Sequence, residues 1–304
     1  MPNTSSNRSA HRFLQGVRFA PSPTGRFHIG NLRTAWISEK LARLLGQTWV
    51  VRVEDLDPLR SQADFWKTQH QDLERLGLRA DLIVWQRQRL PIHQQSLQQA
   101  YEEGRIYPCT CSRREVLEGL ASAPHGPEAV YNGKCRKHPP QQLNSHVGWR
   151  WKSADDEGHR DPLVARGDLA AVEPAYHWAC AIDDADGGYQ LLVRAIDLLP
   201  AEAIQRAIRI WRSPELGDKI RVFHTSLVVH NDGSRLEKRS QGVTLDELKI
   251  STEQLLQNFE RSFDQAAALA SLRQAAIVQR ETPPLIREAA SQVSVGSLLS
   301  LADT

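Results

Sequence analysis

The sequence predicts an α/β protein built on a doubly wound parallel sheet, with an inserted segment and a short C-terminal helical region. Between residues 16 and 106, strand-like and helix-like patterns alternate, and this alternation is typical of parallel strands joined by crossover helices. The alternation stops between residues 107 and 148, a stretch that contains three of the four cysteines. From residue 243 onward the pattern is helical.

The first half of the sheet is expected to contain three strands and three helices. The strands, which are apolar or β-branched runs, cover residues 16–20, 48–53 and 82–84. The helices, in which apolar residues recur at helical spacing, cover residues 32–45, 64–76 and 91–103. Gly46 and Gly77 follow the first two helices, at the position that a helix C-cap favours.

The second half is expected to add three further strands. These apolar runs cover residues 178–183, 190–193 and 223–229. Asp186-Gly187-Gly188 is typical of a turn and would join the first two of them. Pro200 is expected to open a helix that runs to about Trp211. Thr244 and Glu247 have the spacing of a capping box, which predicts the start of the C-terminal helices.

Composition gives no sign of an unusual protein class. The chain has 304 residues, of which 40% are hydrophobic and 24% charged, and its formal net charge is +2. This charge neither indicates nor excludes a nucleic acid partner. No apolar run reaches the roughly 20 residues of a membrane helix, and residues 1–15 have no hydrophobic signal core, so they are expected to form a flexible polar lead. Four cysteines do not suggest a disulfide scaffold, and we expect a cytoplasmic protein.

The segment from Arg18 to Asn31 reads RFAPSPTGRFHIGN and follows the first expected strand. Its prolines fix φ and its glycine tolerates a positive φ, so the segment forms a tight, rigid bend. The helix after the bend presents backbone N–H groups and the positive end of its dipole, which attract phosphate. His28 lies at this point, where a ring nitrogen can donate to a phosphoryl oxygen. The pattern indicates a nucleotide site; the alternative is a solvated loop ahead of a helix.

This segment resembles the HIGH-type signature of class I aminoacyl-tRNA synthetases, in the APSPTG form of the glutamyl/glutaminyl branch. The resemblance implies a Rossmann-type catalytic core that activates an amino acid with ATP and Mg²⁺. It implies an ATP site at His28, Gly30 and Asn31, with His28 also acting in catalysis. The implied amino-acid pocket includes five residues at the start of the segment: Arg18, Phe19, Ala20, Pro21 and Ser22.

Glu54 closes the second expected strand, and ligands of open α/β sheets sit at the carboxyl ends of strands. A capping or solvated acid is the alternative, because Asp55 and Asp57 lie close by. The resemblance implies that Glu54 contacts the α-ammonium group of L-glutamate. By the same resemblance, Tyr176 and Arg194 line the glutamate site. A guanidinium suits such a substrate, because it binds a carboxylate through two parallel hydrogen bonds.

Three cysteines in the inserted segment are candidates for a metal site. Cys109, Cys111 and Cys135 supply three sulfurs, whereas a structural zinc site normally has four N or S ligands. Spacing alone leaves zinc and free thiols equally open, with His125 and His138 as possible fourth ligands. Relatives in the glutamyl-queuosine tRNA(Asp) synthetase family carry one structural zinc here on three cysteines and a tyrosine. That resemblance implies a site at Cys109, Cys111, Tyr131 and Cys135, while Cys180 is expected to be ordinary core.

A second nucleotide motif is expected after the last strand. Residues 235–239 read RLEKR and occupy the place of the KMSKS-like loop of class I synthetases. By resemblance, Lys238 is the catalytic lysine that contacts ATP. Glu237 replaces the usual serine, and a carboxylate beside a triphosphate is unfavourable, so we expect this loop to be less effective or differently arranged. A charged surface hairpin is the alternative.

The resemblance extends over residues 16–245 and favours the glutamyl-queuosine tRNA(Asp) synthetase family. It divides the chain into a lead (1–15), a first catalytic half (16–106), a zinc-binding insertion (107–148), a second catalytic half (149–242) and a helical subdomain (243–304), with no anticodon-binding domain. The implied activity forms glutamyl-adenylate from ATP and L-glutamate without tRNA, and then transfers the glutamate to queuosine in tRNA(Asp). The expected protein is a monomer. The alternatives are a truncated glutamyl-tRNA synthetase and a catalytically lapsed RNA-binding module.

Overall fold

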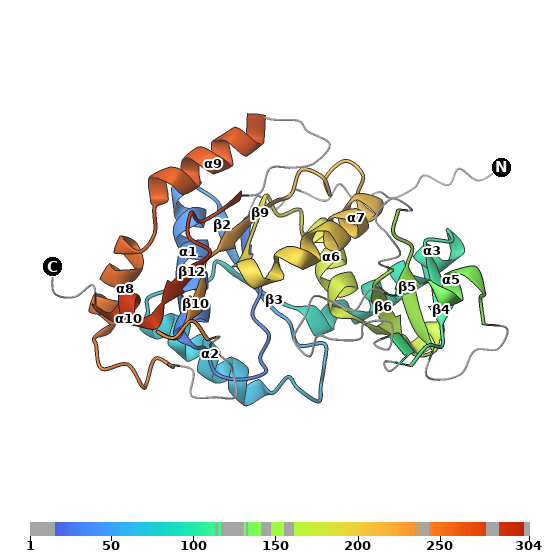
Figure 1. Cartoon of the computed structure of the whole chain (residues 1–304), viewed down its shortest axis with the longest axis horizontal. Coiled ribbons are helices and arrows are strands. Elements are labelled where there is room, and N and C mark those ends of the chain that lie inside the picture. The colour runs from blue at the N-terminus through green and yellow to red at the C-terminus, as the bar shows by residue number, and fades with distance from the viewer. Residues whose placement is uncertain are drawn as a thin grey trace, which may run out of the picture.

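The structure is a computed structural model that describes residues 16–112, 115–116, 131, 133–140, 147–154, 161–234, 236, 243–277 and 286–300. The expected polar lead, Glu237, Lys238 and His125 lie outside these described residues. Figure 1 shows an elongated molecule, with a central parallel sheet, C-terminal helices at one end and a smaller sheet at the other. None of the helices described here has the length and apolar character needed to cross a bilayer.

The central sheet has six strands in the order β11-β9-β8-β1-β2-β3, and every neighbouring pair is parallel. Its strands are β1 (Gly16–Phe19), β2 (Thr48–Val53), β3 (Leu82–Trp85), β8 (Leu191–Ala195), β9 (Arg221–Thr225) and β11 (Ile286–Arg287). The predicted α/β class with a parallel sheet is therefore confirmed. The chain winds outward from β1 in both directions, so β1 and β8 flank the point where strand order reverses. Ligands of such sheets bind at this point.

The two faces of the central sheet differ in chemistry. Val17, Val51 and Val193 alternate onto the face covered by helix α1 (Ile29–Leu44) and belong to the main apolar core. Because successive side chains of a strand point to opposite faces, the neighbouring Arg18, Arg52 and Arg194 lie on the other face, where all three are buried. Buried arginines need acidic partners, and helices α6 (Tyr176–Gly187) and α7 (Glu202–Arg212) provide them.

The helices of the first half lie close to their predicted positions. Helix α1 ends at Leu44, and Gly46 follows with φ +63°, the left-handed conformation that a helix C-terminus favours. Helix α2 spans Ala63–Arg75, and Gly77 follows in the same way with φ +69°. Helix α3 spans Leu90–Glu102, with a proline in its first turn.

The two ends of the inserted segment lie in a second, antiparallel sheet. Its four strands follow chain order: β4 (Ile106–Cys109), β5 (Gly148–Trp151), β6 (Leu163–Arg166) and β7 (Glu173–Pro174). The short helix α5 (Lys134–Lys137) packs beside β4. This sheet continues past residue 148, the expected end of the insertion. Trp149 and Trp151 pack with Trp178 in an apolar cluster, which attaches the antiparallel sheet to helix α6.

The strand predicted over residues 178–183 is wrong, because these residues lie within helix α6. The helix is buried along most of its length, so its apolar residues do not alternate with polar ones as on a surface helix. A short apolar run of this kind fits a buried strand and a buried helix equally well. Gly188, with φ +61°, closes the helix, where the sequence had suggested a turn between two strands.

The single strand predicted over residues 223–229 is divided in two. β9 ends at Thr225, and β10 (Leu227–Val229) leaves the central sheet to pair with β12 (Gln292–Ser294). Ser226 lies between them, and its backbone N–H donates to the side chain of Glu288 at 2.6 Å. Glu288, the acceptor, is more than sixty positions away from Ser226 in the sequence. The local sequence pattern therefore did not reveal the break between β9 and β10.

The C-terminal region contains strands as well as helices. Only half of the predicted capping box forms: the Thr244 amide and hydroxyl both donate to Glu247 at 2.8 Å, but the Glu247 amide donates to the Thr244 carbonyl, and the motif closes a turn where no helix starts. The helices of this region are α8 (Thr252–Arg261), α9 (Gln265–Ile277) and α10 (Val295–Ser300). Because β11 joins the central sheet and β12 pairs with β10, the region is part of the main body.

Candidate active site

A cavity of about 440 Å³ opens at the carboxyl ends of β1 and β8. Every described residue that the sequence assigned to glutamate or ATP lines it: Arg18, Phe19, Ala20, Pro21, Ser22, His28, Gly30, Asn31, Glu54, Tyr176 and Arg194. Leu236, two positions before the predicted catalytic Lys238 in the sequence, also lines this cavity. The sequence therefore identified residues that the fold brings together from four separate segments of the chain.

Arg18 is held by an acid that the sequence analysis did not single out. Its Nε and Nη2 atoms donate to the two carboxylate oxygens of Asp184, at 3.2 and 2.9 Å. Arg52 donates to the same carboxylate at 2.6 Å. Burial raises the pKa of Asp184, but Arg18 and Arg52 outweigh it, and the pKa lies below its ordinary value. Asp184 thus stays ionised and fixes two arginines beneath the cavity.

Glu54 has three side-chain donors around it. Its Oε1 atom accepts from Arg52 at 3.1 Å and from the Cys180 thiol at 3.0 Å, and its Oε2 atom accepts from Ser22 at 3.2 Å. The Glu54 backbone amide also donates to the carbonyl of Pro21 at 2.9 Å, which ties the rigid bend to the end of β2. These contacts hold one carboxylate at the cavity wall, where an ammonium group can reach it.

Cys180 is buried, as the sequence analysis expected, but it is not ordinary core. It lies on helix α6, lines the cavity and donates to Glu54. Burial, and the nearby carboxylate of Glu54, raise the pKa of this thiol well above its usual range. Cys180 therefore acts as a neutral hydrogen-bond donor. The Asp183-Asp184 pair that follows it in the motif was the available signal for acids at this site.

Arg194 extends from β8 toward helix α7. Its Nη1 atom donates to Gln205 at 2.6 Å, and its Nη2 atom pairs with Glu202. Arg209 donates to the other oxygen of Glu202 at 2.6 Å. The Tyr176 ring stands at the cavity wall near these groups, and burial, together with Cys180 and Glu54, raises the pKa of its phenol, so the hydroxyl keeps its proton.

The charged groups beneath the cavity do not balance. Among the described residues, six guanidinium groups (Arg18, Arg52, Arg89, Arg194, Arg209 and Arg212) face five carboxylates (Glu54, Asp183, Asp184, Asp186 and Glu202). The cluster thus carries one positive charge in excess. In a buried setting such an excess favours a ligand with one net negative charge, and an acidic amino acid at neutral pH has that charge.

His28 caps helix α1 with its own side chain. The Nδ1 atom accepts from the amides of Gly30 at 3.1 Å and Asn31 at 3.4 Å, while the Ile29 amide donates to the Val243 carbonyl at 2.9 Å. The expectation that these amides are available to a phosphate is therefore wrong. Because Nδ1 accepts, the proton of the neutral ring lies on Nε2. The imidazole, and not the helix amides, is the donor that this helix end offers to a phosphoryl oxygen.

Gly30 allows the His28 ring to lie against the helix. A Cβ atom at this position would lie 3.0 Å from ring atoms Nδ1 and Cε1 of His28, and 3.2 Å from the Cβ of Val228. We expect Gly30→Ala to displace the ring by a few tenths of an ångström and to raise the KM for ATP about tenfold, since small misplacements of such groups are costly. Steady-state kinetics with each substrate varied in turn would check this. An unchanged KM for ATP, or an equal rise for the amino acid, would contradict it.

The far side of the cavity depends on a buried ion pair. Arg33 on helix α1 donates to both carboxylate oxygens of Glu288, at 2.7 and 2.6 Å, and to Ser262. Glu288 in turn accepts from the Ser226 amide, and the Ser226 hydroxyl donates to the Ala290 carbonyl at 2.6 Å. Ser226 lines the cavity. The C-terminal region therefore fixes the cavity wall at Ser226.

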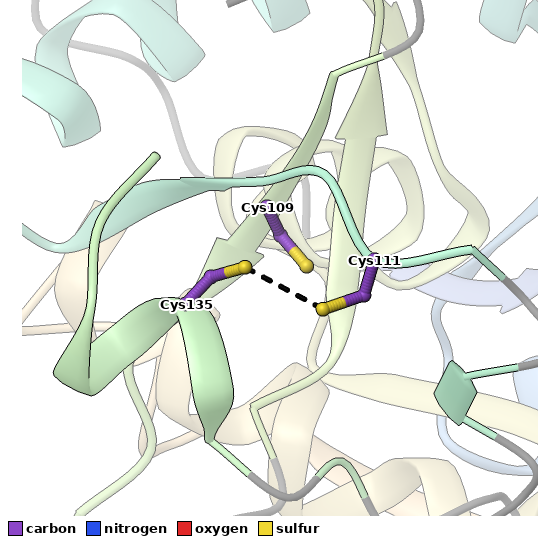
Figure 2. A group of neighbouring side chains, drawn as sticks. All are labelled: Cys109, Cys111 and Cys135. Carbon is purple, nitrogen blue, oxygen red and sulfur yellow. Dashed lines mark hydrogen bonds between the residues drawn. The ribbon is translucent and has the colours of Figure 1, made fainter. Parts of the chain in front are cut away.

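Three of the predicted metal ligands come together at the end of β4. The sulfurs of Cys109, Cys111 and Cys135 all lie within 4.8 Å of one another, and Figure 2 shows the three side chains pointing toward a common centre. Cys111 and Cys135 have a sulfur–sulfur distance of 3.5 Å. A tetrahedron with zinc–sulfur bonds of about 2.3 Å has edges of about 3.8 Å, so this spacing suits zinc. His138 is exposed and does not belong to the group, and His125 lies outside the described residues.

Tyr131 lies where a fourth ligand would be needed. Its hydroxyl is 3.6 Å from the Cys109 sulfur and 3.7 Å from the Cys111 sulfur, and it accepts from the Cys135 amide at 2.6 Å. Arg150 stacks on the Tyr131 ring at 3.8 Å and donates to the Cys109 sulfur at 3.2 Å. A buried arginine here can offset the negative charge of several thiolates. The donor set and its surroundings fit a metal ion.

Comparisons with known proteins agree with this geometry. Residues 16–148 match the family described as tRNA synthetases class I (E and Q), catalytic domain. The chain is similar to the glutamate-tRNA synthetase of Elizabethkingia anophelis in fold, with a TM-score of 0.69 at 19% identity, over 93% of this chain and 69% of that one.

Curated relatives are more similar in sequence. A glutamyl-Q tRNA(Asp) synthetase of Nocardia farcinica is 36% identical over 249 residues, which cover 75% of this chain and 77% of the relative. One of Prochlorococcus marinus is also 36% identical, over 243 residues that cover 76% and 75%. This identity extends across most of both chains, and the fold contains the cavity at β1 and β8 and the three-cysteine cluster. The protein therefore belongs to the glutamyl-Q tRNA(Asp) synthetase family.

Proposed function

We propose that this protein activates L-glutamate with ATP to give glutamyl-adenylate in the absence of tRNA, and then transfers the glutamate to queuosine in the anticodon loop of tRNA(Asp). The observation that carries the proposal is the cavity itself, in which the Glu54 carboxylate, held by three side-chain donors, lies beside a charged network with one positive charge in excess. An acidic amino acid matches both features. The names of the relatives support the same acceptor for this chain.

The roles of the residues follow from their places in the cavity. Glu54 binds the α-ammonium group, and Arg194 with Tyr176 faces the side-chain carboxylate. The bend from Arg18 to Ser22 forms the wall between them. The α-carboxylate oxygen attacks the α-phosphorus of ATP, the bond to the bridging oxygen breaks, and pyrophosphate leaves. Mg²⁺ bound with ATP supplies charge neutralisation on the leaving phosphates.

His28 and Lys238 are proposed to stabilise the charge that develops during this transfer. His28 donates from Nε2 toward the phosphates, because Nδ1 is occupied by the helix amides. Such transfers depend mainly on positioning and electrostatics, so fixed donors are sufficient and no protein nucleophile is needed. In the second step, a hydroxyl of the cyclopentenediol ring of queuosine attacks the acyl carbon and AMP leaves. The adenylate phosphate can accept the proton of that hydroxyl.

Zinc is proposed as the metal of the cysteine cluster, held by Cys109, Cys111, Cys135 and Tyr131. Four protein ligands leave no open position, so the role is structural. The ion would join β4 to helix α5, which are separated in sequence by much of the insertion. It would stabilise this part of the molecule where the described residues around the cluster form only a small apolar group.

We expect Cys109→Ser to lower zinc content well below one ion per chain, because a serine hydroxyl ionises far less readily than a thiol and binds zinc weakly. Atomic absorption on the purified protein would measure this. Cys180→Ser is the matched control, since Cys180 lies outside the cluster and should keep the wild-type metal content. Equal zinc in the wild type and in Cys109→Ser would remove Cys109 from the ligand set.

The activation step is tested by ATP–pyrophosphate exchange with glutamate and no tRNA. Exchange under these conditions is the expected result. Exchange that appears only when tRNA is added would favour a glutamyl-tRNA synthetase that charges a tRNA 3′ end. No exchange under either condition would favour an RNA-binding module without catalysis.

The acceptor is tested separately with radiolabelled glutamate. The label should transfer to tRNA(Asp) that contains queuosine and not to the same tRNA with guanosine at that position. Equal transfer to both would contradict the proposed acceptor. Because this reaction uses tRNA, we propose that the enzyme is cytoplasmic. A single chain contains every residue named for the first step, so we propose that the enzyme is a monomer.

A further inference from the structure

Gln205 on helix α7 lines the cavity and is fully buried, but no role has been assigned to it. Its Oε1 atom accepts from Arg194 at 2.6 Å. Because a guanidinium only donates, this contact also fixes which end of the amide is oxygen and which is nitrogen. Among the described residues, the Nε2 atom makes no well-formed hydrogen bond, although the Tyr176 phenol lies near enough for Gln205 to oppose the rise in its pKa. A buried amide nitrogen without an acceptor is costly, so it points to a ligand.

Arg194 has a second donor of the same kind. Its Nη1 and Nη2 atoms are paired with Gln205 and Glu202, whereas its Nε atom is buried and has no acceptor within the described part of the chain. Arg194 also lines the cavity. Two buried donors on adjacent side chains therefore lack acceptors, next to a cluster that has one positive charge in excess. A carboxylate has two oxygens and one negative charge, and satisfies all three requirements.

We propose that Gln205 contacts the substrate and selects glutamate over glutamine, by donating from Nε2 to one side-chain carboxylate oxygen while Arg194 donates from Nε to the other. The inference rests on the proposed activation of glutamate. Glutamine has the same shape, but its amide nitrogen would face one of the two donors. That contact would place two hydrogen-bond donors against each other in a buried site. A site built to hydrogen-bond its ligand strongly rejects a ligand that cannot accept those bonds.

The decisive variants separate contact with the substrate from support of Arg194. Gln205→Met removes both polar functions. Gln205→Glu keeps an oxygen that accepts from Arg194, but replaces the donor with a second acceptor. If Gln205 only holds Arg194 in place, the added charge of Gln205→Glu should weaken glutamate binding but leave kcat/KM for glutamine unchanged. If Gln205 donates to the substrate side chain, kcat/KM for glutamine should also rise, because the new carboxylate accepts from the glutamine amide.

The measurement is ATP–pyrophosphate exchange without tRNA, with glutamate and glutamine tested separately to give kcat/KM for each. We expect Gln205→Met to raise the KM for glutamate about tenfold or more, the usual size of one lost charged hydrogen bond. We expect Gln205→Glu to lower the glutamate-to-glutamine ratio of kcat/KM by about a hundredfold, because the new carboxylate repels glutamate and accepts from the glutamine amide.

Gln86→Met is the matched control. Gln86 is also buried and donates to Asp183 at 2.8 Å, but it does not line the cavity. Its substitution should lower the melting temperature and leave the glutamate-to-glutamine ratio unchanged. If Gln205→Met fails to fold, Gln205→Glu, which keeps the bond from Arg194, carries the test.

The outcomes distinguish the two proposals. Absence of glutamate-dependent exchange in the wild type would overturn the proposed activation step. Wild-type exchange together with an unchanged kcat/KM for glutamine in Gln205→Glu would overturn the role of Gln205 and leave the activation step standing. A ratio that falls equally in Gln86→Met would also overturn it, because the effect would then arise from loss of buried packing.

Discussion

Glu54→Gln is expected to reduce glutamate-dependent ATP–pyrophosphate exchange about a hundredfold while leaving the protein folded. The α-ammonium group loses its counter-charge, and a charged hydrogen bond of this kind contributes up to about 3 kcal/mol. Glutamine keeps the shape of the side chain and one oxygen that accepts from Arg52, whose bond to Asp184 is unchanged. The KM for glutamate should rise, and the KM for ATP should stay near its wild-type value.

Glu260→Gln provides the comparison, because Glu260 is half exposed, pairs with Lys40 on the surface and lies outside the cavity. Its exchange rate and thermal unfolding should match those of the wild type. Exchange by Glu54→Gln at the rate of Glu260→Gln would remove Glu54 from the amino-acid pocket. A large fall in the melting temperature of Glu54→Gln would instead assign it a structural role.

Asp184→Asn is expected to destabilise the protein by about 3–5 kcal/mol, which is typical when one partner of a buried ion pair is removed. Arg18 and Arg52 both bond this carboxylate, and both are almost completely buried, so neither can turn to solvent. Denaturant unfolding followed by circular dichroism would measure the change. Glutamate binding should weaken too, because Arg18 lines the cavity.

The matched control for this variant is Asp186→Asn, two positions along the same helix. Asp186 pairs with Arg89 and Arg212, but its side chain is 20% exposed, and the side chains of both arginines are also partly exposed. Solvent screens such pairs, so its loss should cost at most about 1 kcal/mol. If both variants unfold at the same denaturant concentration, the buried network around Asp184 does not support the fold as we infer.

The sequence was most informative where local chemistry dictates the backbone. The bend at Pro21, the helix end at Gly46 and the β-branched run of β2 were all recognisable, because proline, glycine and β-branched residues act over a few positions. The candidate site residues were found through motifs, each of which lies within one stretch of the sequence. The structure then brought Arg18, Glu54 and Arg194 to one cavity, and their individual roles stay predictions.

What the sequence did not reveal depends on contacts between distant segments. The helix over residues 176–187 looked like a strand because its burial removes the helical period. Asp184, Gln205 and Cys180 gained their importance from partners on β1, β8 and the end of β2. Even His28, correctly placed at a helix start, proved to bond the amides that were expected to meet phosphate. Only the folded arrangement specifies such partners.

The ion pair between Arg33 and Glu288 also bears on the order in which the protein is made. The two residues are 255 positions apart, and Glu288 is what holds Ser226 at the cavity wall. During synthesis from the N-terminus, the rigid bend, His28 and β8 all leave the ribosome before this acid does. A nascent chain therefore contains most of the cavity residues before it contains the acid that holds Ser226, and the cavity wall at Ser226 is completed only when β11 has docked. In refolding the whole chain is present from the start, so only the slow closure of this long-range contact can delay the wall.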